Sequence, residues 1–537
     1  MDAARPVPGT PVTRARELVD RKDWDGLATL CDQYWLALPE RHESAMVALL
    51  EEVPEAEFAA RPSLLVAWVI CYHAMVDQDS RDRRPFLRQY MELGTRLAGS
   101  LDPERESSPA NLILIGTLAM ITLRGQGRFE EAEARGQRVA ERLAVLHPLP
   151  AVEPAPRPGW LAMQRGLTRS LQADFDGAAE QYRLAHEQAR AEPTAYFAGT
   201  NATANLAMIF AHLGHHETAR KWLDEHESYP PSPRWASTLL EVGATIARGW
   251  DALDRYDFTR FDRIAEATGD GTESFEVWPF IAALMAERGL HTGGPAQALA
   301  HLSTIRLSHA PALTGQGAAR QVLLRAEAEL LIALGEGNRA LRVLTEAGPV
   351  PWLAVPAARL RLLAGDHEAA SALASQGLWA MRAVPRDTRQ LLLIKAVAAV
   401  RAGRTEEAAG LLAALPALRS PHEVLSLATV PPAEREELLR LARIPLSDDA
   451  AARLATAGPV YPERVTLVEL TARERAVLAE LATGDTTPDI AARLVVSAAT
   501  VRTQVQSIYR KLGVSSRKDA LLRARELGLL GYEVHCG

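Results

Sequence analysis

Apolar and polar positions along the first 440 or so residues follow a helical period, and we find no convincing period-two alternation of the kind that marks a half-buried strand. Two clear cases are ANLAMIFAHL at 204–213 and LLRAEAELLIAL at 323–334. Such apolar helices run up to a Gly or Asp, which can end a helix in the left-handed conformation. A polar turn and a second helix follow. The pattern predicts an all-α chain built of helix pairs.

A six-residue sequence recurs at the predicted turn between the two helices of a pair. From the second copy onward, the copies start 30 to 46 residues apart, and their last residue is usually Ala. A small residue there lets two helices approach closely. Neither helix of a pair can bury its apolar face alone, so near-regular spacing predicts an α-solenoid. The nine copies occupy 22–27, 127–132, 173–178, 214–219, 256–261, 293–298, 335–340, 365–370 and 403–408.

Four more helices are predicted between 467 and 530, where a short helix, a tight turn and a longer helix form a helix-turn-helix pattern. Thr471 and Glu474 form the sequence signature of a capping box, and Ser516 with Asp519 repeats it. The predicted first or capping residues of the four helices are, in order, Thr471, Thr487, Ser497 and Ser516.

The third of these helices has two distinct faces. Its predicted buried stripe consists of Val501, Val505, Ile508 and Leu512. The opposite face carries Ala499, Arg502, Thr503, Gln506 and Arg510, with no Asp or Glu. Arg and Gln can pair with guanine and adenine edges in the major groove, and an acid there would repel phosphate. This face therefore predicts DNA recognition.

Charge supports the same interpretation. The chain is 47% hydrophobic and 24% charged, with a net charge of -7. Between 497 and 525, seven basic residues stand against one acid, so this segment is about +6 and the remainder about -13. Positive charge is thus local, as phosphate contact requires. The candidate DNA-contacting residues are Thr487, Ser497, Ala499, Thr500, Arg502, Thr503, Gln506, Arg510, Lys511, Arg517 and Lys518.

The segment LTARERAVLAELATGD…IAARLVVSAATVRTQVQSIYRKLGVSSRKDAL resembles the LuxR-type DNA-binding domain across 467–530. That family commonly has Lys-Thr-His after Thr-Val, where this chain has Arg502, Thr503 and Gln504, and Glu after the capping Ser, where it has Ala498. These departures leave the target bases open. The resemblance implies a homodimer on DNA that pairs through the fourth helix. This helix is rich in apolar residues: Leu521, Leu522, Leu527, Leu529 and Leu530.

The helix pairs resemble tetratricopeptide-like repeats, and more closely those of the maltose-operon type of bacterial activator. Many regulators with such an array also carry an NTPase domain. This sequence has no Gly-Lys dipeptide, which the phosphate-binding loop GxxxxGK[ST] requires. It also shows no metal-ligand spacing of His and Cys and no GxSxG motif. We therefore expect no enzyme activity, catalytic residue, metal or cofactor.

The expected organisation is a disordered N-terminus at 1–14, a helical-repeat sensor or interaction region at 15–443, a linker with one short helix at 444–466, the DNA-binding domain at 467–530 and a tail at 531–537. A proline-rich stretch at 147–159 is a candidate hinge. The longest apolar run, 63–76, is too short to span a bilayer, and the N-terminus lacks the apolar core of a signal peptide. A cytoplasmic, nucleoid-associated protein with no membrane partner is expected.

The leading hypothesis is a bacterial transcriptional regulator that binds double-stranded DNA and whose repeats receive a protein or small-ligand signal. RNA polymerase is a further candidate partner. The alternative is a helical-repeat interaction scaffold, in which the helix-turn-helix serves mainly for docking. An enzyme with a site hidden among the repeats has no support in the sequence. Salt-dependent DNA binding distinguishes the regulator from the scaffold.

Overall fold

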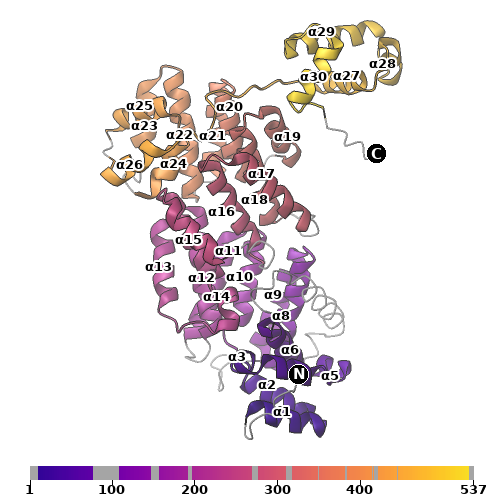
Figure 1. Cartoon of the computed structure of the whole chain (residues 1–537), viewed down its shortest axis with the longest axis vertical. Helices are drawn as coiled ribbons and strands as arrows, with labels where there is room; N and C mark the ends of the chain where they lie inside the picture. Colours follow the sequence, from indigo (N-terminus) through magenta and orange to yellow (C-terminus); the bar gives the residue numbers. More distant parts are fainter. Residues whose placement is uncertain are drawn as a thin grey trace. The chain divides into compact units, whose positions relative to one another are not determined.

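A computed structural model describes residues 10–75, 108–146, 157–190, 196–268, 276–309, 317–348, 350–380, 384–413, 415, 421–443 and 446–530. Every regular element in these ranges is a helix, so the expected all-α fold is confirmed (Figure 1). The tail at 531–537 and most of the candidate hinge lie outside the described residues. The first helix begins at Pro11, so residues 11–14, expected to be disordered, are helical.

The chain packs into two compact units. The first comprises Met1–Asp251, Thr259–Ile281 and Arg306–Arg320, and the second Ala252–Phe258, Ala282–Ile305 and Gln321–Gly537. Within the described residues, no helix is long and apolar enough to cross a membrane.

Nine helix pairs carry the repeat pattern among the described residues. Their first helices are α1 (Pro11–Asp20), α8 (Pro109–Gly125), α10 (Trp160–Leu171), α12 (Tyr196–Leu213), α14 (Ser237–Asp254), α16 (Trp278–His291), α18 (Ala318–Ala333), α20 (Ala354–Leu363) and α22 (Pro385–Arg401). Their second helices are α2 (Trp24–Gln33), α9 (Phe129–Leu146), α11 (Phe175–Arg190), α13 (His216–Glu227), α15 (Phe258–Thr268), α17 (Pro295–Ser308), α19 (Gly337–Ala347), α21 (His367–Ala380) and α23 (Thr405–Ala413).

The recurring six-residue sequence forms the turn in all nine pairs. The second helix of each pair begins at the third residue of this sequence. The first residue of the sequence has a positive φ in every copy, and it is Gly in six of the nine. The other three are Lys22, Ala173 and Tyr256, with φ of 55°, 65° and 60°. A left-handed residue at this point ends the first helix and turns the chain toward the second.

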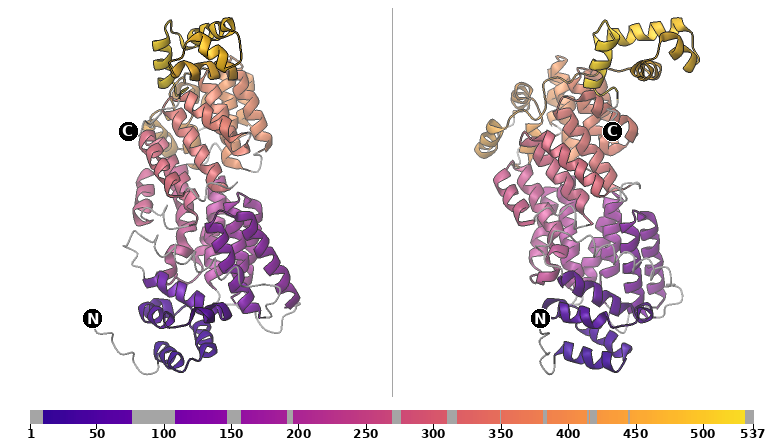
Figure 2. Two further views of the ribbon diagram at one scale, coloured as in Figure 1. Left: turned by 90° about the vertical axis from the view of Figure 1, so that its right-hand side faces the viewer. Right: turned by 45° about the vertical axis from the view of Figure 1, so that its right-hand side comes forward.

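Close packing explains the alanine at the last position. The alanine at this position is completely buried in five copies: Ala132, Ala178, Ala340, Ala370 and Ala408. In the first unit, α10 packs against α8 and α12 of the neighbouring pairs, and in the second unit α22 packs against α20. Figure 2 shows successive helices of each unit lying side by side. Stacking between neighbouring pairs thus buries the apolar faces.

Further helices lie between the first two pairs and after the last pair. Among the described residues, those between the first two pairs are α3 (Leu38–Arg41), α4 (Glu43–Leu50), α5 (Glu55–Ala60) and α6 (Pro62–Met75). The apolar run near residue 70 forms α6, whose residues from Pro62 to Trp68 are all buried. After the last pair come α24 (Val424–Ala428), α25 (Pro432–Ala442) and α26 (Asp448–Thr456). Helix α26 is the short helix expected in the linker.

After α26, the linker packs on the repeats of the second unit through the buried residues Val460, Tyr461 and Val465. The Tyr461 hydroxyl donates a hydrogen bond of 2.7 Å to Glu329 Oε2, and the Arg359 guanidinium lies 4.4 Å from the centre of the Tyr461 ring. Burial raises the pKa of Tyr461 well above its ordinary value. The Val465 amide donates to the Leu363 carbonyl at 2.9 Å. These contacts make the segment an ordered part of the second unit.

Candidate nucleic-acid interface

The C-terminal module consists of α27 (Ala472–Ala482), α28 (Thr487–Arg493), α29 (Ala498–Leu512) and α30 (Arg517–Glu526). All four helices contribute to one small core. Its buried residues are Leu470, Val477, Leu478, Leu481, Ile490, Ala491, Val501, Ile508, Leu512, Ala520 and Ala524. This core fixes the orientation of α29, because three of its residues belong to that helix.

Local capping sets the helix boundaries. Thr471 and Glu474 form the predicted capping box, with the Thr471 amide donating to the Glu474 carboxylate at 2.7 Å. Ser497 caps α29 and accepts from the Thr500 amide at 3.0 Å. The cap of α28 is Thr486, and Thr487 is the first residue of that helix. The Ser516 hydroxyl caps α30 by accepting from the Asp519 amide at 3.1 Å.

Helix α29 separates a buried and an exposed face. Val501 and Ile508 are completely buried, Leu512 is buried, and Val505 is partly buried. The predicted recognition face remains exposed along its whole length. At about 100° per residue, its members span an arc of roughly 100° on the opposite side. They are Ala499, Arg502, Thr503, Gln506 and Arg510.

Three polar residues of this face differ in how free they are. Thr503 Oγ1 donates to the Ala499 carbonyl at 3.1 Å. Neither Arg502 nor Gln506 has a side-chain hydrogen bond to another described residue, so both can bind an external partner. A planar guanidinium and an amide at this spacing can each form two hydrogen bonds with a base edge.

The start of α29 forms a second part of the interface. Ser497 is exposed and Thr500 half-buried, and their hydroxyl oxygens lie 2.8 Å apart. A helix N-terminus carries partial positive charge, which favours a nearby phosphate. Thr487, at the start of α28, is half-buried. The tight turn predicted between these helices contains Val495, which is 88% exposed and has a φ of 56°.

Lys511 lies away from the recognition face and binds a buried carboxylate. Its Nζ is 2.6 Å from Glu474 Oε2 and donates to the Glu469 carbonyl at 3.0 Å. Ser507 donates to the other Glu474 oxygen at 2.7 Å. Burial acts to raise the pKa of Glu474, but Lys511, Thr471 and Ser507 together outweigh it and lower this pKa to about 2. Glu474 is therefore an ionised anchor between α27 and α29.

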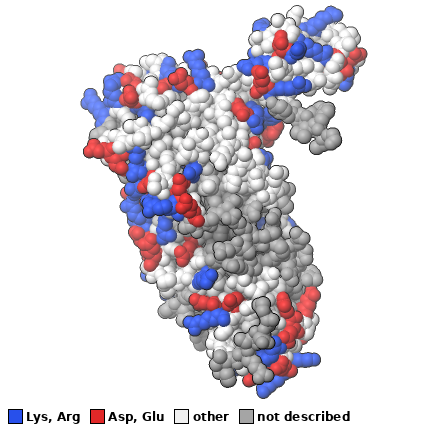
Figure 3. All heavy atoms as spheres, in the orientation of Figure 1, with Lys and Arg blue, Asp and Glu red and all other residues white. Residues whose placement is uncertain are grey.

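The two basic residues at the start of α30 also differ. Arg517 donates hydrogen bonds to the carbonyls of Leu481, at 2.6 Å, and Asp485, at 2.7 Å. It thereby binds the C-terminal end of α27. Lys518 is exposed and has no side-chain bond to another described residue. Figure 3 shows basic side chains over the module at the upper right, with acidic ones mainly at its edges.

Most of the apolar residues expected to pair two copies serve the module's own core. Leu521, Leu527, Leu529 and Leu530 are partly buried against that core. Leu522 is 56% exposed. Helix α30 ends at Glu526, four residues before the predicted end, and Gly528 follows with a φ of 67°. An exposed pairing surface centred on α30 is therefore smaller than the sequence suggested.

Residues 468–524 match the family of bacterial regulatory proteins, luxR family (GerE). The match covers α27, α28, α29 and most of α30. The C-terminal module is thus a luxR-type helix-turn-helix domain, and this supports a DNA-binding transcriptional regulator. Among the described residues, no group of three or more His, Cys, Asp and Glu could hold a metal ion.

Proposed function

We propose that the protein is a bacterial transcriptional regulator that inserts α29 into the major groove of double-stranded DNA. Arg502, Thr503 and Gln506 would read base edges. The observation that carries this proposal is the exposed, acid-free face of α29 within a module that matches the luxR family. The family match supports the type of contact, and Arg502 in place of the usual Lys makes the preferred bases specific to this chain.

The other candidate residues would position the module on the DNA backbone. Arg510 and Lys518 are exposed and can contact phosphate, and Ser497 with Thr500 would offer hydroxyl and amide donors at the start of α29. Ala499 allows close approach to a thymine methyl group, and Thr487 would contact phosphate from α28. Lys511 and Arg517 would act mainly by holding α27, α29 and α30 together.

The repeats would receive a protein or small-ligand signal and pass it to the module through the packed linker. The Asn338 amide nitrogen donates to the Val468 carbonyl at 2.7 Å, and the Val468 amide donates to Asn338 Oδ1 at 3.1 Å. Asn338 belongs to α19 and Val468 to the start of the module. Movement in this pair would therefore alter how α27 is held. We also propose a homodimer on DNA, contact with RNA polymerase and a place in the cytoplasm with the nucleoid.

The test compares two arginines of the same helix. Operator sites are first selected from random DNA with the full-length protein. Arg502→Ala should weaken binding to the selected site by about 1–3 kcal/mol and relax the preference at one base position. Arg510→Ala should weaken selected and random DNA alike, and should reduce the slope of affinity against salt by about one unit.

Arg128→Ala is the matched control, because Arg128 is an exposed arginine of the repeats. It should leave DNA affinity unchanged. If the wild-type protein selects no site and shows no salt-dependent binding, the interaction scaffold becomes the better explanation. If the two α29 variants behave alike on both kinds of DNA, the assignment of the recognition face is wrong.

A further inference from the structure

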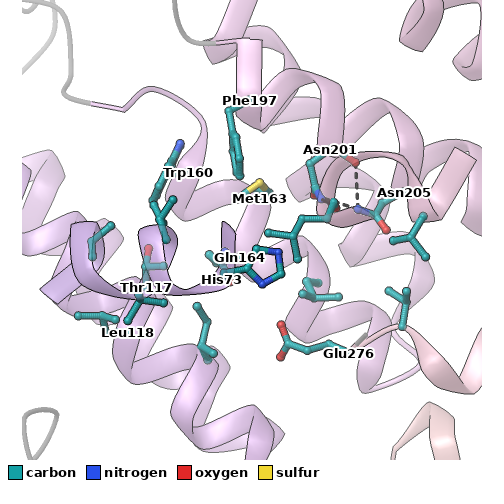
Figure 4. A pocket seen from close by; sticks show the side chains of 18 of the residues that line it. His73, Thr117, Leu118, Trp160, Met163, Gln164, Phe197, Asn201, Asn205 and Glu276 are labelled. Carbon is teal, nitrogen blue, oxygen red and sulfur yellow. Dashed lines mark hydrogen bonds between the residues drawn. The ribbon is translucent and has the colours of Figure 1, made fainter. Parts of the chain in front are cut away.

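The first unit contains a cavity of about 300 Å³ on a side shared by the first helices of successive pairs. Helices α8, α10, α12 and α14 line it, together with α6 and the residues just before α16 (Figure 4). Such a volume is at the lower end of the range for small-molecule sites. The cavity lies wholly within the first unit and is separate from the DNA-binding module.

Aromatic side chains form one wall. The ring centres of Trp160 and Phe197 are 5.4 Å apart, and Phe197 stacks with Trp235 at 6.1 Å. All three are at least nine-tenths buried, which makes the wall rigid. Leu118 and Met163 extend the apolar lining. Flat or alicyclic surfaces bind well against a wall of this kind.

Two buried polar atoms in the lining have no hydrogen-bond partner among the described residues: Asn205 Oδ1 and Thr117 Oγ1. The Asn205 nitrogen is already used, since it donates to the Asn201 carbonyl and Oδ1, both at 2.9 Å. Asn201 in turn donates to the Leu239 carbonyl at 2.9 Å. The amide of Asn205 is thereby held in one orientation, with its oxygen left unpaired. Buried polar atoms normally have partners, and these two remain without one beside the cavity.

The carboxylate in the lining is compensated. Glu276 is the one carboxylate among the described lining residues, and Arg124 Nε and Nη2 bind its two oxygens at 2.8 and 2.9 Å. Arg124 is buried and also donates to Gln164 Oε1 at 2.7 Å and Thr168 Oγ1 at 3.2 Å. A charged ligand would lose its hydration without finding a free counter-charge on this carboxylate.

We propose that this cavity binds an uncharged, largely aromatic or alicyclic small molecule that donates a hydroxyl or N–H hydrogen to Asn205 Oδ1. A second polar group of the ligand would reach Thr117 Oγ1. A peptide segment fits less well, because its backbone donors and acceptors would need more partners than the few polar side chains of the lining supply. This inference deepens the proposed function by naming the class of signal, and its role in regulation rests on that function.

The test uses N-phenyl-1-naphthylamine, an uncharged fluorescent probe with two aromatic groups and one N–H. Full-length protein should bind it saturably at one site. Asn205→Leu keeps the side-chain size but removes the acceptor, and should weaken binding by about five- to tenfold. Leu239→Trp places an indole at the partly exposed rim and should abolish binding. Trp379→Ala is the control, because Trp379 is 79% exposed and lies outside the lining.

Binding to the selected operator is measured on the same preparations, and all three variants should retain it without ligand. Weak, non-saturating fluorescence would overturn the assignment of the cavity as a small-molecule site. That result is expected if the region is instead an open surface that binds a protein segment. So would saturable binding that survives Leu239→Trp or is lost in Trp379→Ala. If either of these results is obtained while operator binding is intact, the cavity is not a ligand site, and the proposed DNA-binding function is unaffected. Probe binding without any DNA binding instead rejects the proposed regulator and leaves the cavity as assigned.

Discussion

The basic side chains of the C-terminal module have two different kinds of surroundings. Arg502 and Lys518 extend into solvent, whereas Lys511 and Arg517 are bound to the module's own carboxylate and carbonyl oxygens. A bound cation must lose or share its partner before it contacts phosphate, and that raises the cost of the contact. Positive charge alone therefore does not identify the residues that touch DNA.

The ion pair between Lys511 and Glu474 should stabilise the module. The folded-state pKa of Glu474, about 2, is below the ordinary 4.5, so its interactions stabilise the module above about pH 4.5. This stabilisation is lost as the pH falls toward 2. Lys511→Ala leaves a buried carboxylate with one partner fewer and should reduce the local stability by about 2 kcal/mol at pH 7. Below pH 3, the difference from wild type should shrink.

Hydrogen exchange of α27 and α29 amides in the full-length protein measures this local stability. Lys518→Ala is the control, because it removes the same charge from an exposed side chain with no partner among the described residues. It should not change exchange in either helix. Equal effects of the two substitutions would show that net charge, rather than the pair with Glu474, governs the stability of the module.

For single residues, the sequence predicts which side of a helix is buried better than it predicts which side chains contact one another. Val501 and Ile508 are recognisable as buried, and Arg502 as exposed, because a helical period is a local property. The contact between Lys511 and Glu474 joins residues 37 positions apart. It forms only when α27 and α29 pack around a common core. The prediction of Glu474 as a capping residue is confirmed. Its ion pair with Lys511 could not be predicted from the neighbouring sequence.

Among the elements, turns within the helix pairs were the most predictable. The left-handed residue, the polar residue after it and the start of the second helix all lie within six residues. The local sequence is therefore enough to predict where each turn lies. Even Lys22 and Tyr256 adopt the left-handed conformation at the position that is usually Gly. The linker shows the opposite case. Its polar, proline-containing sequence suggests a loose connection, yet Tyr461 binds Glu329 and Arg359, more than 100 residues away along the chain.

The second prediction therefore addresses the linker. Tyr461→Ala removes the ring and its hydrogen bond and leaves a cavity beside Glu329 and Arg359. A buried aromatic truncated in this way costs about 3 kcal/mol. The segment should then open more often, and trypsin should cleave after the exposed Arg464 more than tenfold faster. Limited proteolysis of the full-length protein with mass analysis of the fragments measures this rate.

Tyr461→Phe provides the graded control. It keeps the ring beneath Arg359 and loses only the bond to Glu329, so its cleavage rate should lie between those of wild type and Tyr461→Ala. Unchanged cleavage in Tyr461→Ala would mean that the packing of Val465 and its neighbours alone holds the linker.

For the whole molecule, the central question is how a small reading surface achieves selectivity. One recognition helix contacts only a few base pairs, and helix-turn-helix proteins solve this by placing two copies on two half-sites. Here four of the five leucines near α30 pack inside the module, and Leu522 is exposed. A pairing patch this small falls below the size of a standard interface. We therefore expect pairing to be weak in solution and to become substantial on DNA.

The last prediction follows from that expectation. Full-length protein should bind an operator with two half-sites at least about tenfold more tightly than one with a single half-site, because the second copy binds beside the first at a high effective concentration. Leu522→Asp should reduce this advantage, since it places a charge where two copies of α30 would meet in the proposed dimer. Leu307→Asp is the matched control: Leu307 is 81% exposed on α17, so the same substitution there should leave the advantage unchanged. Gel-shift titration on both DNA lengths measures the ratio for each variant. Equal affinity of the wild type for one and two half-sites would mean that the protein reads DNA as a monomer. If Leu522→Asp still binds two half-sites as much more tightly than one as the wild type does, the contact between copies lies away from α30.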